Sequence, residues 1–135
     1  MRLIIAEDEV LLALCIADAV EDAGHLVLCC EPSASRALRC AREEGWDLAL
    51  VNISLNEGST ADLQLAKDLK AELGIPSIFV SGQRDDAITA NRVALGFLPK
   101  PYSLQDLVAA ISVAEVLTQG RRPPPAAIPA TLELF

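Results

Sequence analysis

The sequence predicts an α/β fold, a doubly wound parallel sheet of five strands with five helices. Short apolar runs alternate along the chain with longer segments in which apolar residues recur every three or four positions. The runs do not alternate between apolar and polar residues, which is typical of strands buried on both faces of a parallel sheet. Together these observations indicate five strand–helix units in one domain.

The expected strands occupy residues 3–6, 25–30, 47–51, 76–80 and 97–98. Aliphatic residues dominate the first four, as expected for strands in the middle of a layered fold. The last run is the shortest, and Pro99 directly after it lacks an amide hydrogen, which favours a short strand.

The expected helices occupy residues 9–23, 33–44, 61–73, 85–95 and 103–117. Ser33 and Ser103 stand where a side-chain oxygen can cap the second and fifth helices. A glycine follows each of the first four helices and is expected to end it: Gly24, Gly45, Gly74 and Gly96. Apolar residues at helical spacing mark the first helix, at Val10, Leu11, Leu14 and Val20, and the last helix, at Leu104, Leu107, Val108, Ile111 and Leu117.

The composition changes after residue 118, which divides the chain into a domain at 1–118 and a C-terminal tail at 119–135. Four of the eight prolines lie in the tail, so we expect it to be extended or disordered. Its apolar end, from Leu132 to Phe135, suggests the alternative that it docks on a partner or on a second protomer.

The net charge of −8 argues against nucleic-acid and membrane partners, because an acidic protein repels both DNA and anionic lipid. No apolar run approaches the roughly 20 residues that cross a bilayer. The short apolar run after Arg2 lacks the length and cleavage site of a signal peptide, so we expect a cytoplasmic protein.

Four cysteines are present, at positions 15, 29, 30 and 40, and no pair has the CxxC spacing. Adjacent Cys29 and Cys30 should point to opposite faces of a strand. Since His25 is the single histidine, a zinc site is disfavoured. We expect the cysteines to be small apolar residues in a reducing compartment.

Polar residues follow four of the expected strands, at the edge where α/β proteins bind their ligands. The first strand is followed by acids, the third by an amide, the fourth by a hydroxyl and the fifth by a lysine. These residues are Glu7, Asp8, Asn52, Ser81 and Lys100. Because the carboxyl ends of parallel strands share one edge, we expect these side chains to converge.

The order and spacing of these motifs resemble the receiver domain of bacterial two-component response regulators. The resemblance covers residues 1–118 and rests on IAEDE at 5–9, DLALVNISL at 47–55, IFVSG at 78–82 and LPKPY at 98–102. It implies a flavodoxin-like sheet with strand order 2-1-3-4-5.

The resemblance also assigns roles to the acids and to the acceptor. Glu7 and Asp8 match the pair that binds Mg²⁺, and the backbone carbonyl of Ser54 matches a third ligand. Asn52 falls on the phosphoacceptor position, where the family has aspartate.

Three further positions match the residues that respond to the phosphoryl group. Ser81 matches the hydroxyl that bonds it, and Lys100 matches the lysine that pairs with it. The bond from Lys100 to Pro101 is expected to be cis. Phe97 matches the aromatic residue that switches conformation.

Asn52 should block ordinary phosphorylation, because an acyl phosphate forms only on a carboxylate nucleophile. It should also weaken Mg²⁺ binding, since one of three carboxylates is missing. Three explanations stay open: a natural pseudo-receiver, an ordinary receiver with a disabled acceptor, or phosphorylation of a nearby group such as Ser54.

We therefore expect a single-domain response regulator, not an enzyme, that relays a signal by protein–protein contact. The expected partners are a sensor histidine kinase or phosphotransfer protein and a downstream protein target. A homodimer through residues 85–118 or through the tail is a further expectation. The alternatives are a phosphorylation-independent scaffold and a flavodoxin-like flavin-binding protein. The flavin alternative is disfavoured, because acids at 7–9 would repel a bound phosphate.

Overall fold

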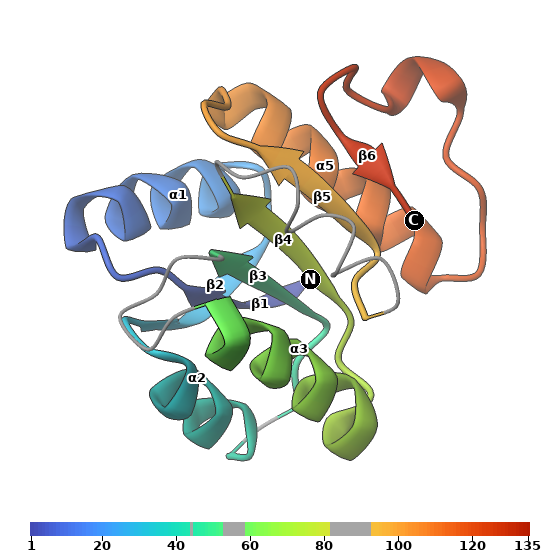
Figure 1. Cartoon of the computed structure of the whole chain (residues 1–135). Helices are drawn as coiled ribbons and strands as arrows, with labels where there is room; N and C mark the ends of the chain where they lie inside the picture. Colours follow the sequence, from blue (N-terminus) through green and yellow to red (C-terminus); the bar gives the residue numbers. More distant parts are fainter. Residues whose placement is uncertain (44, 53–58, 82–92) are drawn as a thin grey trace.

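The computed structural model describes residues 1–43, 45–52, 59–81 and 93–135. A six-stranded sheet forms its centre, in the order β2-β1-β3-β4-β5-β6 (Figure 1). The strands are β1 (Arg2–Ala6), β2 (Leu26–Glu31), β3 (Leu48–Asn52), β4 (Ser77–Ser81), β5 (Gly96–Pro99) and β6 (Glu133–Leu134). The first five are parallel and follow the predicted order, so the predicted fold class is confirmed.

Helices cover both faces of the sheet (Figure 1). They are α1 (Val10–Asp22), α2 (Ala34–Ala41), α3 (Ser59–Leu73) and α5 (Leu104–Thr118), with a short 3-10 helix η1 (Pro125–Ala127) in the tail. Helices α2 and α3 pack with one set of alternate strand residues, and α1 and α5 pack with the other set. Both faces of the strands are therefore buried, as the continuous apolar runs predict.

The predicted helix caps at the two serines are confirmed. The Ser33 Oγ accepts a hydrogen bond from the Arg36 backbone amide at 3.4 Å, and the Ser103 Oγ accepts one from Asp106 at 3.0 Å. Gly24 and Gly74 follow α1 and α3 with positive φ angles of 95° and 66°. Left-handed backbone of this kind is accessible to glycine without steric cost, and it ends a helix.

Gly96 has a different position from the one predicted. It is the first residue of β5 and does not terminate a helix. The expected helix at 85–95 lies mostly outside the described residues, but residues 93–95 form a turn and a bend. The backbone amide of Leu95 donates to the carbonyl of Ser77 at 2.8 Å, so the chain already runs beside β4 here.

The apolar stripe predicted for α1 is only partly buried. Its inward face is formed by Ala13, Ile16, Ala17 and Val20. Val10, Leu11 and Leu14 are exposed, by 68%, 74% and 55%. Two of the four inward residues are alanines, and the larger residues of the first half of α1 lie on the surface.

The tail returns to the sheet instead of extending from it (Figure 1). Strand β6 pairs antiparallel with β5, and the Phe135 amide donates to the Leu95 carbonyl at 3.0 Å. Leu132 is 7% exposed and joins the core beside α1 and α5. The expected extended tail is thus wrong, and the apolar C-terminal segment docks on its own domain.

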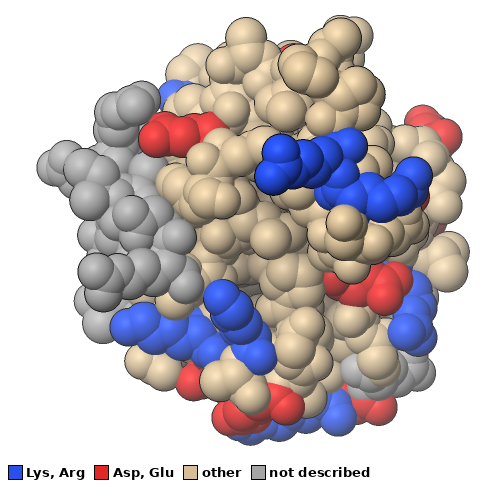
Figure 2. Space-filling model, turned by 90° about the vertical axis from the view of Figure 1, so that its right-hand side faces the viewer, with Lys and Arg blue, Asp and Glu red and all other residues tan. Residues whose placement is uncertain are grey.

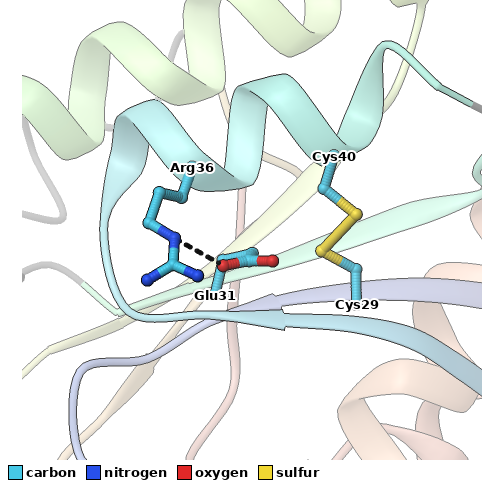
Figure 3. Close-up of a disulfide and its surroundings, with 4 residues drawn as sticks. All are labelled: Cys29, Glu31, Arg36 and Cys40. Atoms are coloured by element: carbon cyan, nitrogen blue, oxygen red, sulfur yellow. Dashed lines mark ion pairs between the residues drawn. A yellow bond between two sulfur atoms is a disulfide. The ribbon is translucent and has the colours of Figure 1, made fainter.

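The cysteine expectation is wrong for two of the four residues. Cys29 in β2 and Cys40 in α2 form a disulfide (Figure 3). Cys15 and Cys30 are free and exposed. Cys29 is buried and Cys30 exposed, so the adjacent pair does point to opposite faces. The sequence spacing gave no signal of this pairing, because a strand, a turn and a helix separate the two residues.

Candidate functional site

The carboxyl ends of four strands bring the predicted polar residues to one edge of the sheet. Asn52 ends β3 and Ser81 ends β4, and both are buried, with 4% and 0% exposure. Glu7 directly follows β1 and is 5% exposed. Its backbone amide donates to the carbonyl of Glu31 at the end of β2, at 3.0 Å. Lys100 follows β5 and is half-buried.

Asn52 joins the lysine to the acid. Its Nδ2 donates a hydrogen bond to Oε2 of Glu7 at 2.5 Å, and its Oδ1 accepts one from Nζ of Lys100 at 2.9 Å. The amide is therefore oriented with its donor toward the anion and its acceptor toward the cation. An aspartate at this position would have no donor for Glu7 while both carboxyl groups are ionised.

Glu7 has a raised pKa, chiefly because burial disfavours its charged form. The hydrogen bonds from the Glu9 backbone amide, at 3.1 Å, and from Asn52 act in the opposite direction, as does the charge of Lys100. A hydrogen bond with Asp8 adds to the rise. Asp8 is half-buried beside Glu7. The cation and the amide thus only partly compensate for the burial of this carboxylate.

Solved structures with a similar arrangement of strands and helices include receiver domains. The signal receiver domain of a modulated diguanylate cyclase from Desulfovibrio desulfuricans G20 is 30% identical, with a TM-score of 0.76. The alignment covers 87% of this chain and 95% of that one. The chain belongs to the response regulator receiver-domain family. Such domains act in two-component signalling.

Curated regulators also match this receiver domain. The phyllosphere-induced regulator PhyR of Methylorubrum extorquens is 31% identical over 123 residues, which are 90% of this chain and 46% of PhyR. The transcriptional regulatory protein PdtaR of Mycobacterium tuberculosis is 28% identical over 116 residues, 84% of this chain and 56% of PdtaR. The chain spans about half the length of these relatives. No protein-family model matches the sequence.

The remaining predicted site residues occupy the following places. Phe97 is 1% exposed in β5 and packs in the core formed with α2 and α3. The peptide bond between Lys100 and Pro101 is cis, as predicted. Ser54 lies outside the described residues. The functional roles of these residues stay predictions.

The site fits a magnesium ion poorly. Both oxygens of the Glu7 carboxylate already accept hydrogen bonds, one from the Glu9 amide and one from Asn52. Asn52 turns its nitrogen toward Glu7, and its oxygen is taken by Lys100. A hard cation prefers charged oxygen ligands, and the Asn52 amide supplies a neutral oxygen already bonded to Lys100 where a third carboxylate would stand.

Tyr102 and the exposed part of α1 were not predicted as parts of the site region. Burial, followed by the nearby charges of Glu7 and Glu9, raises the pKa of Tyr102 to about 12. Its ring borders a hollow of about 600 Å³ beside the site. The hollow is lined by Glu9, Leu12, Cys15, Lys100, Pro101, Tyr102 and Leu104. Helical periodicity alone does not reveal such a surface, because it does not say which apolar residues face outward.

Surface charge bears on the class of partner. On the face shown in Figure 2, the Lys and Arg side chains lie in separate groups with acids and uncharged residues between them. Nucleic-acid binding surfaces carry continuous basic patches. Among the described residues, no helix has the length and apolar character needed to cross a membrane.

Proposed function

We propose that this receiver domain signals by protein–protein contact and that Asn52 blocks ordinary phosphorylation. The observation that supports the proposal is the hydrogen-bonded chain from Lys100 through Asn52 to Glu7. In this proposal Asn52 takes the place of the acceptor aspartate of the family. The proposal includes a cytoplasmic location and no catalytic activity of the domain's own.

The chemistry of the amide supports the block. Phosphoryl transfer to a receiver forms an acyl phosphate, which requires a carboxylate oxygen as nucleophile. The nitrogen lone pair of an amide is delocalised into the carbonyl group, and the amide oxygen is neutral, so it is a much weaker nucleophile than a carboxylate oxygen. In addition, Oδ1 of Asn52 is engaged by the Lys100 ammonium, and Nδ2 has no lone pair to offer.

The same contacts support weak magnesium binding. Glu7 and Asp8 are the two carboxylates that would hold the ion, together with the proposed Ser54 carbonyl. The part of the magnesium ion in a receiver is to offset negative charge beside the acceptor. Here the Asn52 amide and the Lys100 ammonium already partly offset the Glu7 charge. We expect binding to be weaker than in Asn52→Asp.

The upstream partner in this proposal is a sensor histidine kinase or a phosphotransfer protein, and the downstream partner is a protein target. Val10, Leu11 and Leu14 of α1 form an exposed apolar surface, which we call the α1 patch. Exposed apolar patches beside a functional site mark protein interfaces. The α1 patch lies at the start of the helix, close to Glu7, and is where we place contact with the upstream protein.

A phosphorylation-independent scaffold is the second candidate. It is favoured by the hydrogen-bond chain, because Asn52 links the Lys100 ammonium to the Glu7 carboxylate directly. The two candidates differ in the need for a kinase. Substituting Leu11→Glu in the α1 patch should weaken binding to a cognate kinase or phosphotransfer protein. A scaffold would show no binding to such a protein in the first place.

The deciding experiment is intact-mass measurement after incubation with a small acyl phosphate and Mg²⁺. Asn52→Asp should gain about 80 Da, the mass of one phosphoryl group, and the unsubstituted chain should gain nothing. If Asn52→Asp gains nothing although it binds Mg²⁺, the site assignment is wrong.

A gain in the unsubstituted chain would overturn the proposed block. The control variant Ser54→Ala then separates the remaining explanations. Loss of the gain in this variant identifies Ser54 as the acceptor, and its persistence points to another group. Asn52→Ala serves as the matched control, since it removes the amide without creating a nucleophile.

A further inference from the structure

Cys29 and Cys40 are not among the residues of the strand-end site, and they join α2 to the sheet (Figure 3). We propose that they form a reversible dithiol–disulfide site, oxidised by a hydroperoxide and reduced by a small dithiol. Neither cysteine belongs to the motifs that identify the receiver domain. The inference is therefore independent of the proposed function.

The fold holds the two cysteines in bonding position. Cys29 lies in β2 and Cys40 near the end of α2, and their Cα atoms are 6.8 Å apart. That separation lies within the range that a disulfide spans. The residues between them complete the strand, the turn and the helix, so folding itself brings the two thiols together. In the disulfide-bonded chain both residues keep their places in β2 and α2.

The two sulfurs differ in access. Cys29 is 6% exposed and belongs to the core shared with α2 and α3. Cys40 is half-buried and borders a surface hollow of about 160 Å³. Glu31, Arg36, Arg39 and Glu43 line the rest of this hollow. A small oxidant or reductant therefore reaches Cys40 first, and Cys29 acts as the resolving thiol.

The surroundings favour the disulfide over a bound metal. Ligand atoms of Cys29, Cys40 and Glu31 lie within 4.8 Å of one another, so in geometry alone they suit a cation. However, the Glu31 carboxylate pairs with Nε of Arg36 at 3.2 Å (Figure 3). This ion pair engages one of the two Glu31 carboxylate oxygens and places a guanidinium cation beside the cluster, which disfavours a second cation there. A disulfide is neutral and needs no such ligand.

The oxidation proceeds in two balanced steps. The Cys40 thiolate attacks the hydroperoxide, the O–O bond breaks, and the alcohol leaves with a proton, which gives a sulfenic acid at Cys40. The Cys29 thiolate then attacks the Cys40 sulfur, the S–O bond breaks, and hydroxide leaves and takes up a proton to form water. Two thiols lose two electrons, and the hydroperoxide becomes one alcohol and one water.

The reverse reaction is two thiol–disulfide exchanges. One thiolate of the dithiol attacks Cys40 and releases the Cys29 thiolate. The second thiol of the reagent then attacks the mixed disulfide and releases the Cys40 thiolate. The reagent leaves as its own internal disulfide. Disulfides that solvent can reach are the labile ones, and the half-buried position of Cys40 meets this condition.

The test uses the full chain with Cys15→Ser and Cys30→Ser, which removes the two exposed free thiols. After hydrogen peroxide treatment this background should lose about 2 Da, titrate no free thiol and form no covalent dimer. A small dithiol should restore two thiols. The oxidised form should melt about 8 °C higher, because the closed loop restricts the unfolded chain.

Adding Cys29→Ser to this background is the matched control. It keeps Cys40 and should neither form the disulfide nor gain the thermal shift. Two thiols that remain titratable after peroxide, or a disulfide that the dithiol cannot open in the folded chain, would overturn the proposal. So would oxidation that yields only covalent dimers, because the two cysteines would then pair between chains.

Discussion

Replacing Asn52 by aspartate changes one donor into an acceptor at a buried position. In the folded chain Nδ2 of Asn52 donates to Glu7 at 2.5 Å, and this bond is lost in Asn52→Asp. A hydrogen bond to a charged group contributes about 1.5–3 kcal/mol. The substituted chain also places a second carboxylate against Glu7, which is itself 5% exposed.

Two charge effects of the substitution largely cancel. Two carboxylates about 3 Å apart repel by about 6 kcal/mol at an effective dielectric constant of about 20. The Lys100 ammonium, 2.9 Å from the oxygen of residue 52, attracts the new charge by a similar amount. What remains is the lost hydrogen bond, so Asn52→Asp should be destabilised by about 2 kcal/mol. This corresponds to a melting temperature lower by about 6 °C.

The assay is urea unfolding at neutral pH with a chelator, repeated with Mg²⁺. A ligand at a hundred times its dissociation constant stabilises a protein by about 2.7 kcal/mol. Mg²⁺ should therefore restore Asn52→Asp and leave the unsubstituted chain nearly unchanged. The penalty should shrink as the pH falls, because one protonated carboxyl of the pair can again donate to the other.

The matched control is Asn52→Asp combined with Lys100→Met, which leaves the repulsion without the attraction. It should be less stable than Asn52→Asp alone. If Asn52→Asp in chelator is as stable as the unsubstituted chain, the hydrogen bond from Asn52 does not matter to folding. A double variant no less stable than the single one would show that Lys100 does not offset the added charge.

Three further predictions concern stability elsewhere in the molecule. A Cβ at Gly96 would lie 2.9 Å from the Glu133 carbonyl oxygen, so Gly96→Ala should loosen β6 and speed amide hydrogen exchange there. In the control Gly45→Ala the new Cβ meets only the flexible Arg2 side chain, so amide exchange in β6 should stay unchanged. Burial lowers the pKa of His25 below 6.5. The unfolded chain therefore binds a proton at His25 more readily than the folded chain does. The free energy of unfolding should be full above pH 6.5 and should decline as the pH falls toward the pKa of His25 in the folded chain. Urea unfolding of His25→Gln should show a smaller decline. The Tyr102 hydroxyl is buried without a hydrogen-bond partner among the described residues. Tyr102→Phe should therefore lower the free energy of unfolding by less than about 0.5 kcal/mol, as measured by thermal unfolding. A larger loss of stability would show that the hydroxyl does have a partner.

The sheet and the convergence of its polar edge were predictable from the sequence. Strands buried on both faces give continuous apolar runs, and parallel strands place their carboxyl ends at one edge. Glu7, Asn52 and Lys100 were therefore expected near one another. The direction of the Asn52 amide was not, because it depends on which neighbour is a donor and which an acceptor.

Other features depend on contacts between distant segments and left no local pattern. Strand β6 has two residues and forms only because β5 offers it an edge. The Cys29–Cys40 bond depends on how α2 folds back over β2. The apolar residues Val10, Leu14 and Val20 were all assigned to the stripe predicted for α1, although only Val20 is buried. Periodicity identifies the helix but does not identify its inward face.

The short β6 strand also affects how the protein behaves at high concentration. Without it, β5 would present unpaired amide and carbonyl groups along one side of the sheet, and such an edge recruits strands from other molecules. With only two residues, β6 satisfies part of that edge and then ends, so it provides little template for another strand. The tail thus protects the domain from edge-to-edge aggregation, and chains with a displaced tail should form sheet-rich aggregates more readily.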